Sequence, residues 1–417
     1  MTEKKRQNLL IFFCWLIYTV AYVGRYSFSA NVNAIMDFYG TGKGETGLIG
    51  TFFFFAYGIG QIINGLLCKK YNKKYVLTIA LIVSSIVNAI IFIGVPFWAL
   101  KFLWLVNGIA QSFLWSSLIS LISKNVSHSR LKVAVVVMST SLAVGTFITY
   151  GLSALFNLFN GFKYSFLLGA GTMGVVAVLW LIFHDKLTLK ADDFIEKEIE
   201  LERKESEQKE KTGKTLAINF VVLFICLALF AVINNFIKDG LNTWVPTILK
   251  ETYNLTNSLS VALTIILPVI NLFGAMLSEW IYGKLKDFVT TLAVMSLFAL
   301  VAIAIIIFTL KSVMIVTLIT FAVVTLLMTG MTHVIVSSAP VYMRSKMDAG
   351  LTSGVLDGFC YLGSTLSSYG LGAIAENAGW TNAFVIMLVA CLVPVIVGVT
   401  LIIIQSVKKR KRSKSEN

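Results

Sequence analysis

Charged side chains are scarce in this sequence: they make up 13% of its 417 residues, whereas 57% of the residues are hydrophobic and the mean hydropathy is +0.81. Soluble domains carry about twice that share of charge, so the composition excludes a soluble globular protein. Prolines number only five, and apolar runs of about 20 residues, each long enough to cross a bilayer as a helix, recur from end to end. The sequence therefore predicts an all-α membrane protein.

Patterns for metal binding and nucleotide binding are also missing. The three histidines are isolated, the five cysteines are scattered without disulfide or metal spacing, and no glycine-rich phosphate loop is present. An enzyme at a membrane face needs clustered acids, bases or metal ligands, and the sequence lacks such a cluster. We therefore expect no enzymatic activity, no metal and no cofactor, so any transport should be driven by gradients.

Apolar windows predict twelve transmembrane helices in two groups of six, separated by the long charged stretch HDKLTLKADDFIEKEIELERKESEQKEKTGK. The windows lie at approximately 8–38, 46–68, 75–96, 98–123, 132–159, 163–183, 216–245, 256–283, 288–310, 312–338, 349–374 and 381–406. We expect an N-terminal six-helix bundle over 1–185, a charged cytoplasmic linker over 186–215, a C-terminal six-helix bundle over 216–406 and a basic cytoplasmic tail over 407–417.

Lysine and arginine placement predicts the orientation in the membrane. Loops on the side shared by both termini carry twenty of these residues, against five in the opposite loops. The positive-inside rule then places both termini in the cytoplasm, in a multi-pass protein of the plasma membrane. The basic surplus, a net charge of +14, fits topology and anionic lipid better than a nucleic-acid partner. We expect the protein to function as a monomer.

The two halves resemble each other, as internal repeats of transporters do. YGLSALFNLFNGFKYSF at 150–166 aligns with YGLGAIAENAGWTNAF at 369–384 with a one-residue gap. By the same logic, Arg25 in the first helix falls opposite Lys238 in the seventh. Each half therefore contributes one cation at an equivalent place.

Arg25 stands near the middle of an apolar helix, where a charge costs several kcal/mol unless it faces a partner or a water-filled path. Tyr18, Tyr22 and Ser29 share its helical face. In the seventh helix, Asn234, Lys238 and Asn242 recur every four residues, beside Asn235 and Asp239, and we expect Gly240 and Pro246 to loosen the helix there. Two cations facing one central cavity predict a site for an anion with several oxygens.

Internal charge pairing is the alternative, with Arg25 or Lys238 neutralised by Asp239 or by Asp357. Asp357 is the only acid deep within its segment, and a buried carboxylate near cations either holds them or exchanges protons. His333 could titrate near neutrality, but a lone histidine on an apolar helix more often forms a packing hydrogen bond.

Twelve helices in two repeats, a charged central loop and termini on one side resemble the major facilitator superfamily. Its signature in the loop between helices 2 and 3 is present in degraded form as GLLCKKYNKKYVL. Within the superfamily, the chain is most similar to the organophosphate:phosphate antiporters, of which the glycerol-3-phosphate and hexose-phosphate transporters are known kinds. The resemblance rests on AYVGRYSFSANVNAIM, AYGIGQIINGLL, NGIAQSFLWSS, FIKDGLNTWVPTILKE and CYLGSTLSSYGLGAIAENAGW.

This resemblance implies that Arg25 and Lys238 bind the phosphoryl group, since they match the two arginine positions that bind phosphate in that family. It also implies substrate-facing roles for residues of helices 1, 2 and 4: Tyr18, Tyr22, Gln61, Gln111 and Trp115. Gln61 stands where the glycerol-3-phosphate transporter has a lysine, and Leu142 stands where it has a histidine.

The predicted function is secondary transport of a small organic anion, an organophosphate, in exchange for inorganic phosphate. The alternative is a proton-coupled carrier of another anion or amphipathic solute with Asp357 as the coupling site.

Overall fold

We describe the chain from a computed structural model, which places residues 2–67, 71–188, 220–342 and 349–415. The elements in these ranges are helices, and eleven spans are long and apolar enough to cross a membrane. The last span, Leu351–Ile404, covers 54 residues and contains two helices, because Gly379 has a non-helical backbone (φ 80°, ψ 165°). The predicted fold class, an all-α membrane protein of two six-helix bundles, is confirmed.

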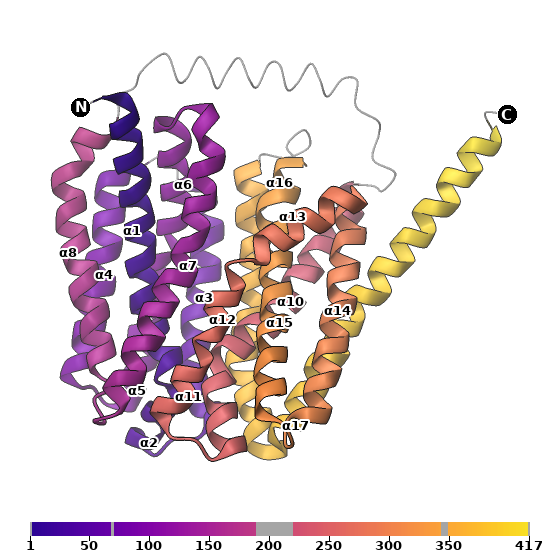
Figure 1. The fold of residues 1–417 in the computed structure, drawn as a ribbon. Coiled ribbons are helices and arrows are strands. Elements are labelled where there is room, and N and C mark those ends of the chain that lie inside the picture. The colour runs from indigo at the N-terminus through magenta and orange to yellow at the C-terminus, as the bar shows by residue number, and fades with distance from the viewer. Residues whose placement is uncertain (1, 68–70, 189–219, 343–348, 416–417) are drawn as a thin grey trace.

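The first bundle contains the helices before the charged stretch (Figure 1). Its first and fourth spans are interrupted, at Asn31 and at Phe113, where one helix ends and the next begins. The helices are α1 (Glu3–Ala30), α2 (Val32–Tyr39), α3 (Lys43–Leu67), α4 (Lys73–Ile93), α5 (Phe97–Ser112), α6 (Leu114–Asn125), α7 (His128–Asn157) and α8 (Tyr164–Leu187).

The second bundle begins with α10. Two of its spans, the eighth and the tenth counted along the whole chain, each consist of more than one helical segment. A short π-helical turn, η1 (Val334–Ser338), interrupts the tenth. The elements are α10 (Phe220–Tyr253), α11 (Asn257–Thr264), α12 (Ile266–Asn271), α13 (Gly274–Leu285), α14 (Phe288–Thr309), α15 (Met314–His333), η1, α16 (Ala339–Tyr342) and α17 (Ala349–Ser415). Most of the predicted linker over 186–215 lies outside the described residues.

Helix α10 corrects one expectation. It runs unbroken from Phe220 to Tyr253 with Pro246 inside it, although Gly240 and Pro246 predicted a loosened segment. Proline removes one donor from the helical ladder and frees the carbonyl four residues earlier, which is that of Asn242. The Tyr150 hydroxyl of α7 donates to this carbonyl oxygen at 2.8 Å, so the other bundle supplies the missing partner.

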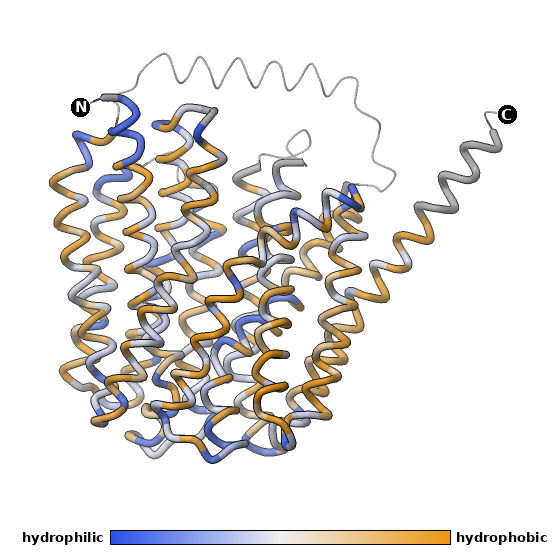
Figure 2. The backbone as a smooth tube through the Cα atoms, viewed as in Figure 1, coloured by the Kyte–Doolittle hydropathy of each residue, from blue (hydrophilic) through white to orange (hydrophobic). Residues whose placement is uncertain are grey.

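The hydropathy of the surface fits a bilayer. Figure 2 shows hydrophobic residues along the lengths of the helices, and hydrophilic residues gather mainly at the two ends of the molecule. Large apolar side chains on the outside are strongly exposed, among them Phe308 at 83% and Ile93 at 80%. Exposed apolar area on this scale indicates lipid contact.

The bundles meet along two seams, α3 with α17 and α7 with α11 and α12. Glycine makes the first seam close: a Cβ atom on Gly47 would lie 2.3 Å from the Ser368 carbonyl oxygen. Ser368 in turn donates its hydroxyl to the Gly47 carbonyl oxygen at 2.8 Å. Small residues and cross-helix hydrogen bonds are the usual means of helix association in membranes.

Candidate functional site

A cavity lies between the two bundles. Aromatic rings from the first bundle and from α17 form much of its wall: Tyr22, Tyr26, Phe28, Phe53, Phe54, Trp104 and Tyr361. Charged and amide side chains come from α10 and α12, with one arginine from α1: Arg25, Lys238, Asp239, Asn242 and Asn271. The two cations that the sequence repeat pairs therefore share one cavity.

Arg25 is 7% exposed and has no carboxylate within ion-pair distance in the described ranges. Its guanidinium lies over three aromatic rings, with Cζ 4.4 Å from the centroid of Tyr57, 4.9 Å from Tyr22 and 5.1 Å from Phe53. Ring faces attract a cation without cancelling its charge. An anion in the cavity would meet a positive group that has no close acidic partner among the described side chains.

Two of the three guanidinium nitrogens have protein partners. Nε donates to Gln111 Oε1 at 3.0 Å, and Nη1 donates to the Tyr361 hydroxyl of the other bundle at 3.3 Å. Nη2 is buried and has no hydrogen-bond partner among the residues that the structure describes. Because an unsatisfied buried donor is costly, a ligand oxygen that accepts from Nη2 would gain more than an ordinary hydrogen bond.

Lys238, unlike Arg25, has an acidic side chain nearby. Its Nζ lies 3.3 Å from the Thr332 hydroxyl oxygen and 3.8 Å from Asp239 Oδ1. The second oxygen of Asp239 accepts from Asn235 Nδ2 at 3.3 Å and from the Ser364 hydroxyl at 2.5 Å. Asp239 is therefore shared between Lys238 and neutral donors, so the pairing that we considered from the sequence is partial.

The predicted substrate-binding residues divide into two layers. Tyr22 and Asn242 line the cavity with Arg25 and Lys238. The other five are not part of the lining and lie behind it: Tyr18, Gln61, Gln111, Trp115 and Asn234.

Residues of the second layer hold lining side chains or their neighbours. The Gln61 amide donates to the Tyr57 hydroxyl at 3.0 Å, beneath the ring that covers the guanidinium. The Tyr18 hydroxyl accepts from Tyr22 at 3.2 Å, and its ring packs against Trp115 with centroids 5.0 Å apart. The Asn234 amide donates to the Thr332 hydroxyl at 2.8 Å, next to Lys238. Sequence spacing alone could not separate these two layers.

Asp357 and His333 lie apart from the lining. The Asp357 carboxylate interacts electrostatically with Lys238, Arg25 and Asp239, but no basic side chain in the described ranges lies within 4.0 Å of it. His333 Nε2 lies 3.0 Å from Glu279 Oε1, which also accepts from the Ser338 hydroxyl at 2.7 Å. The histidine thus forms a hydrogen bond to a half-exposed carboxylate rather than contributing to the central cavity.

Several lining residues were not predicted, among them Tyr26, Asn271, Thr329 and Tyr361. Tyr26 directly follows Arg25 in the sequence. It lines the cavity because α1 exposes more than one helical face to it. Tyr361 belongs to the quoted CYLG motif, and its place beside Arg25 depends on the packing of α17 against α3. The sequence signal that could have identified Tyr361 is its polar hydroxyl in a glycine-rich part of the helix.

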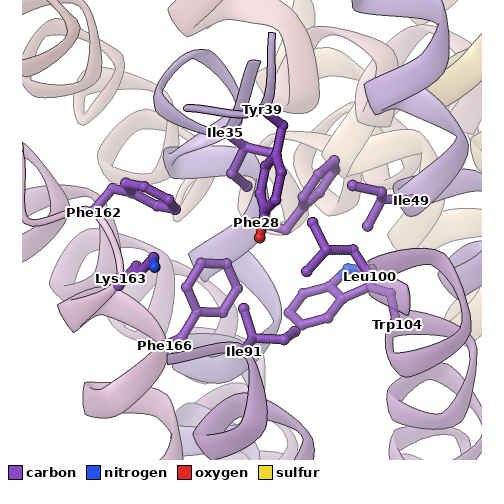
Figure 3. Close-up of a pocket in the computed structure, with 10 residues that line it drawn as sticks. All are labelled: Phe28, Ile35, Tyr39, Ile49, Ile91, Leu100, Trp104, Phe162, Lys163 and Phe166. Atoms are coloured by element: carbon purple, nitrogen blue, oxygen red, sulfur yellow. The ribbon is translucent and has the colours of Figure 1, made fainter. Parts of the chain in front are cut away.

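A second, apolar pocket lies inside the first bundle (Figure 3). Its side chains point toward one another from α1 to α5 and from α8 and the loop before it, and Lys163 and Tyr39 are its polar members. The Tyr39 hydroxyl already donates to the Val95 carbonyl oxygen at 2.7 Å. Phe28 and Trp104 separate this pocket from the central cavity, so we regard it as packing space beneath the site.

Contacts between the bundles close the end of the molecule opposite the N-terminus, where α2 and α11 lie (Figure 1). Lys250 Nζ lies 2.7 Å from Asp37 Oδ2, and Lys43 Nζ lies 2.9 Å from Glu251 Oε1. Both ion pairs join the first bundle to α10. Together with the Tyr150 hydrogen bond, they hold the two bundles in contact on that side of the molecule.

Comparison with known proteins identifies the family to which this chain is similar. The family model described as Major Facilitator Superfamily matches residues 14–347. Among curated proteins, the "Membrane sensor protein UhpC" of Salmonella typhimurium is 24% identical over 92% of this chain and 89% of its own. A "Probable hexose phosphate transport protein" of Chlamydia trachomatis is 24% identical over 94% and 91%. The "Hexose-6-phosphate:phosphate antiporter" of Salmonella typhimurium is 24% identical over 91% and 86%.

Solved structures with the same fold are transporters of diverse solutes. A bacterial homologue of the human lysosomal transporter Spinster, in an inward-facing and occupied conformation, has a TM-score of 0.72 at 16% identity and covers 96% of both chains. A POT family transporter in complex with 5-aminolevulinic acid has a TM-score of 0.75 at 12% identity, covering 95% of this chain and 96% of its own. At these identities the likeness extends to the fold alone.

Proposed function

The chain belongs to the major facilitator superfamily, and we propose that it is a transporter that exchanges a small organophosphate for inorganic phosphate. The observation that carries this proposal is Arg25, a guanidinium that shares a cavity with Lys238 and has no carboxylate within ion-pair distance among the described residues. A phosphoryl group offers several oxygens to both cations at once. The curated relatives named for hexose-phosphate transport support the same substrate class.

We propose that transport proceeds by alternating access around this cavity in the plasma membrane. The bundles over 1–185 and 216–406 would rock against each other, and the ion pairs near α2 and α11 would break when that end opens. The excess of lysine and arginine in loops on the side of the termini supports a cytoplasmic location for both termini. The closed end would then face outward.

Exchange in liposomes tests the proposal. Purified protein in liposomes loaded with inorganic phosphate should take up labelled phosphate, and hexose, glycerol and glycerate phosphates should compete. Arg25→Ala should abolish uptake, because it removes the uncompensated cation. Arg6→Ala is the matched control, since Arg6 lies on the same helix but donates to the Leu187 carbonyl oxygen at 3.1 Å. Uptake that survives Arg25→Ala, or wild-type protein that neither takes up phosphate nor binds it, would argue against an organophosphate carrier.

Proton coupling is the second candidate, and the position of Asp357 favours it. A carboxylate that feels two cations but pairs closely with neither can gain and lose a proton during a transport cycle. Asp357→Asn separates the candidates. Phosphate exchange that persists in this variant supports the antiporter, whereas loss of proton-driven uptake of another anion supports the alternative.

A sensor is also compatible with the relatives, because the first of them is named a membrane sensor protein. A sensor would bind phosphate or an organophosphate without turnover. Saturable binding by detergent-solubilised protein, together with no exchange in liposomes, would assign the chain to that role.

A further inference from the structure

The hydrogen bonds of Gln111 determine how Arg25 meets the cavity. Gln111 is fully buried in α5, outside the cavity lining, and its Oε1 accepts from Arg25 Nε. Its Nε2 donates to the Ala21 carbonyl oxygen at 3.3 Å and to Asn107 Oδ1 at 3.2 Å. A backbone carbonyl can only accept, so the amide nitrogen must face Ala21 and the oxygen must face the guanidinium. The orientation of this amide is thereby determined.

The Gln111 contact holds one nitrogen of the guanidinium, Nε. With Nε held by Gln111 and Nη1 by Tyr361, the planar group can no longer rotate, and Nη2 is the nitrogen left for a ligand. An amide achieves this without charge. A carboxylate of the same shape would place a negative oxygen against Nε and form a charge-assisted hydrogen bond with it, and the site would then contain its own anion.

We propose that Gln111 is a positioning residue that keeps Arg25 both oriented and uncompensated, so that the substrate rather than the protein supplies the counter-charge. This inference deepens the proposed function and rests on it for the identity of the ligand. It assigns to Gln111 a role through Arg25 instead of direct contact with substrate.

Gln111→Glu tests the role because it keeps the side-chain shape and an oxygen against Arg25 Nε, and it adds a negative charge. It also removes the Nε2 donor that faces Ala21 O and Asn107 Oδ1, so the control must lose a buried amide donor as well. Asn64→Asp is the matched control: Asn64 is also fully buried, and its amide donates to the backbone of α5 at Ser112 O, 3.0 Å away, without touching Arg25. We expect Gln111→Glu to raise the phosphate KM at least about tenfold while the maximal rate changes less than about twofold, the pattern of lost binding without lost turnover. Asn64→Asp should leave KM within about twofold of the wild type.

Thermal unfolding without substrate provides the second arm. The new carboxylate should pair with Arg25, so Gln111→Glu should unfold at a higher temperature than Asn64→Asp, whose carboxylate does not contact Arg25. Equal KM values for Gln111→Glu and wild type would overturn the proposal. If the wild type does not exchange phosphate, the proposed function fails, and the unfolding comparison still decides on Gln111: equal destabilisation of the two variants would overturn its role.

Discussion

Removal of the Tyr150 hydroxyl should weaken the closed end of the transporter. The hydroxyl donates to the Asn242 carbonyl oxygen, which lacks its helical donor because residue 246 is proline. In Tyr150→Phe this carbonyl stays unpaired only while the bundles are in contact, since water reaches it when they separate. The contact is partly buried, so we assign it about 1 kcal/mol, the lower end of the cost of an unsatisfied group. That energy shifts the ratio of closed to open molecules about fivefold.

Distance measurements between spin labels can read this ratio. Cysteines at Phe38 and Leu259, exposed residues on opposite bundles near the closed end, would carry the labels after the five native cysteines are replaced. The population at the short distance should fall in Tyr150→Phe. Tyr369→Phe is the control, because Tyr369 is the repeat equivalent of Tyr150 but is 46% exposed.

A second substitution, Pro246→Ala, tests whether the unpaired Asn242 carbonyl is the cause of the shift. Pro246→Ala restores a backbone N–H that donates to the Asn242 carbonyl oxygen within α10. The double variant Tyr150→Phe with Pro246→Ala should therefore regain most of the closed population. If Tyr150→Phe and Tyr369→Phe behave alike, or if Pro246→Ala gives no rescue, the hydrogen bond does not hold the closed end.

Three further predictions concern charge and packing. Lys238→Arg should keep or lower the phosphate KM, because a guanidinium binds two oxygens at once, whereas Lys238→Met should raise it at least about tenfold in the exchange assay. Asp37→Asn removes a half-exposed ion pair with Lys250 worth about 0.2–1 kcal/mol, so the spin-label populations should shift less than about fivefold, and less still at high salt. Gly363→Ala should lower the unfolding temperature by an amount that corresponds to about 1–3 kcal/mol, since its Cβ would lie 2.0 Å from a backbone carbonyl oxygen of α10. Gly370→Ala, with open space around its Cβ, should not lower it.

Much of the fold follows from the sequence because the bilayer leaves few choices. A chain with 57% hydrophobic residues and recurring apolar runs must satisfy its backbone polar groups within each span, so the twelve predicted helices agree with the structure. The continuity of α10 through Pro246 could not be predicted. The donor that replaces the missing hydrogen bond belongs to Tyr150, 92 residues away in the other bundle.

For the cavity lining, the sequence predicted residues on one face of each helix that carries a cation. A charge within a span must face something polar, and this argument places Arg25 and Lys238 on a common cavity together with Tyr22 and Asn242, which lie one turn away from them. Gln111 illustrates the limit. Whether a buried amide contacts the substrate or the residue behind it depends on the separation of α1 and α5, and sequence spacing carries no information on that distance.

Equilibrium binding of labelled phosphate to the purified protein tests the central claim most directly, because it separates the anion site from the transport cycle. We predict saturable binding by the wild type and by Arg6→Ala, and loss of binding in Arg25→Ala with the folded protein retained. Equal binding by Arg25→Ala and Arg6→Ala, or no binding by any of the three proteins, would contradict the assignment of this cavity as a phosphate site.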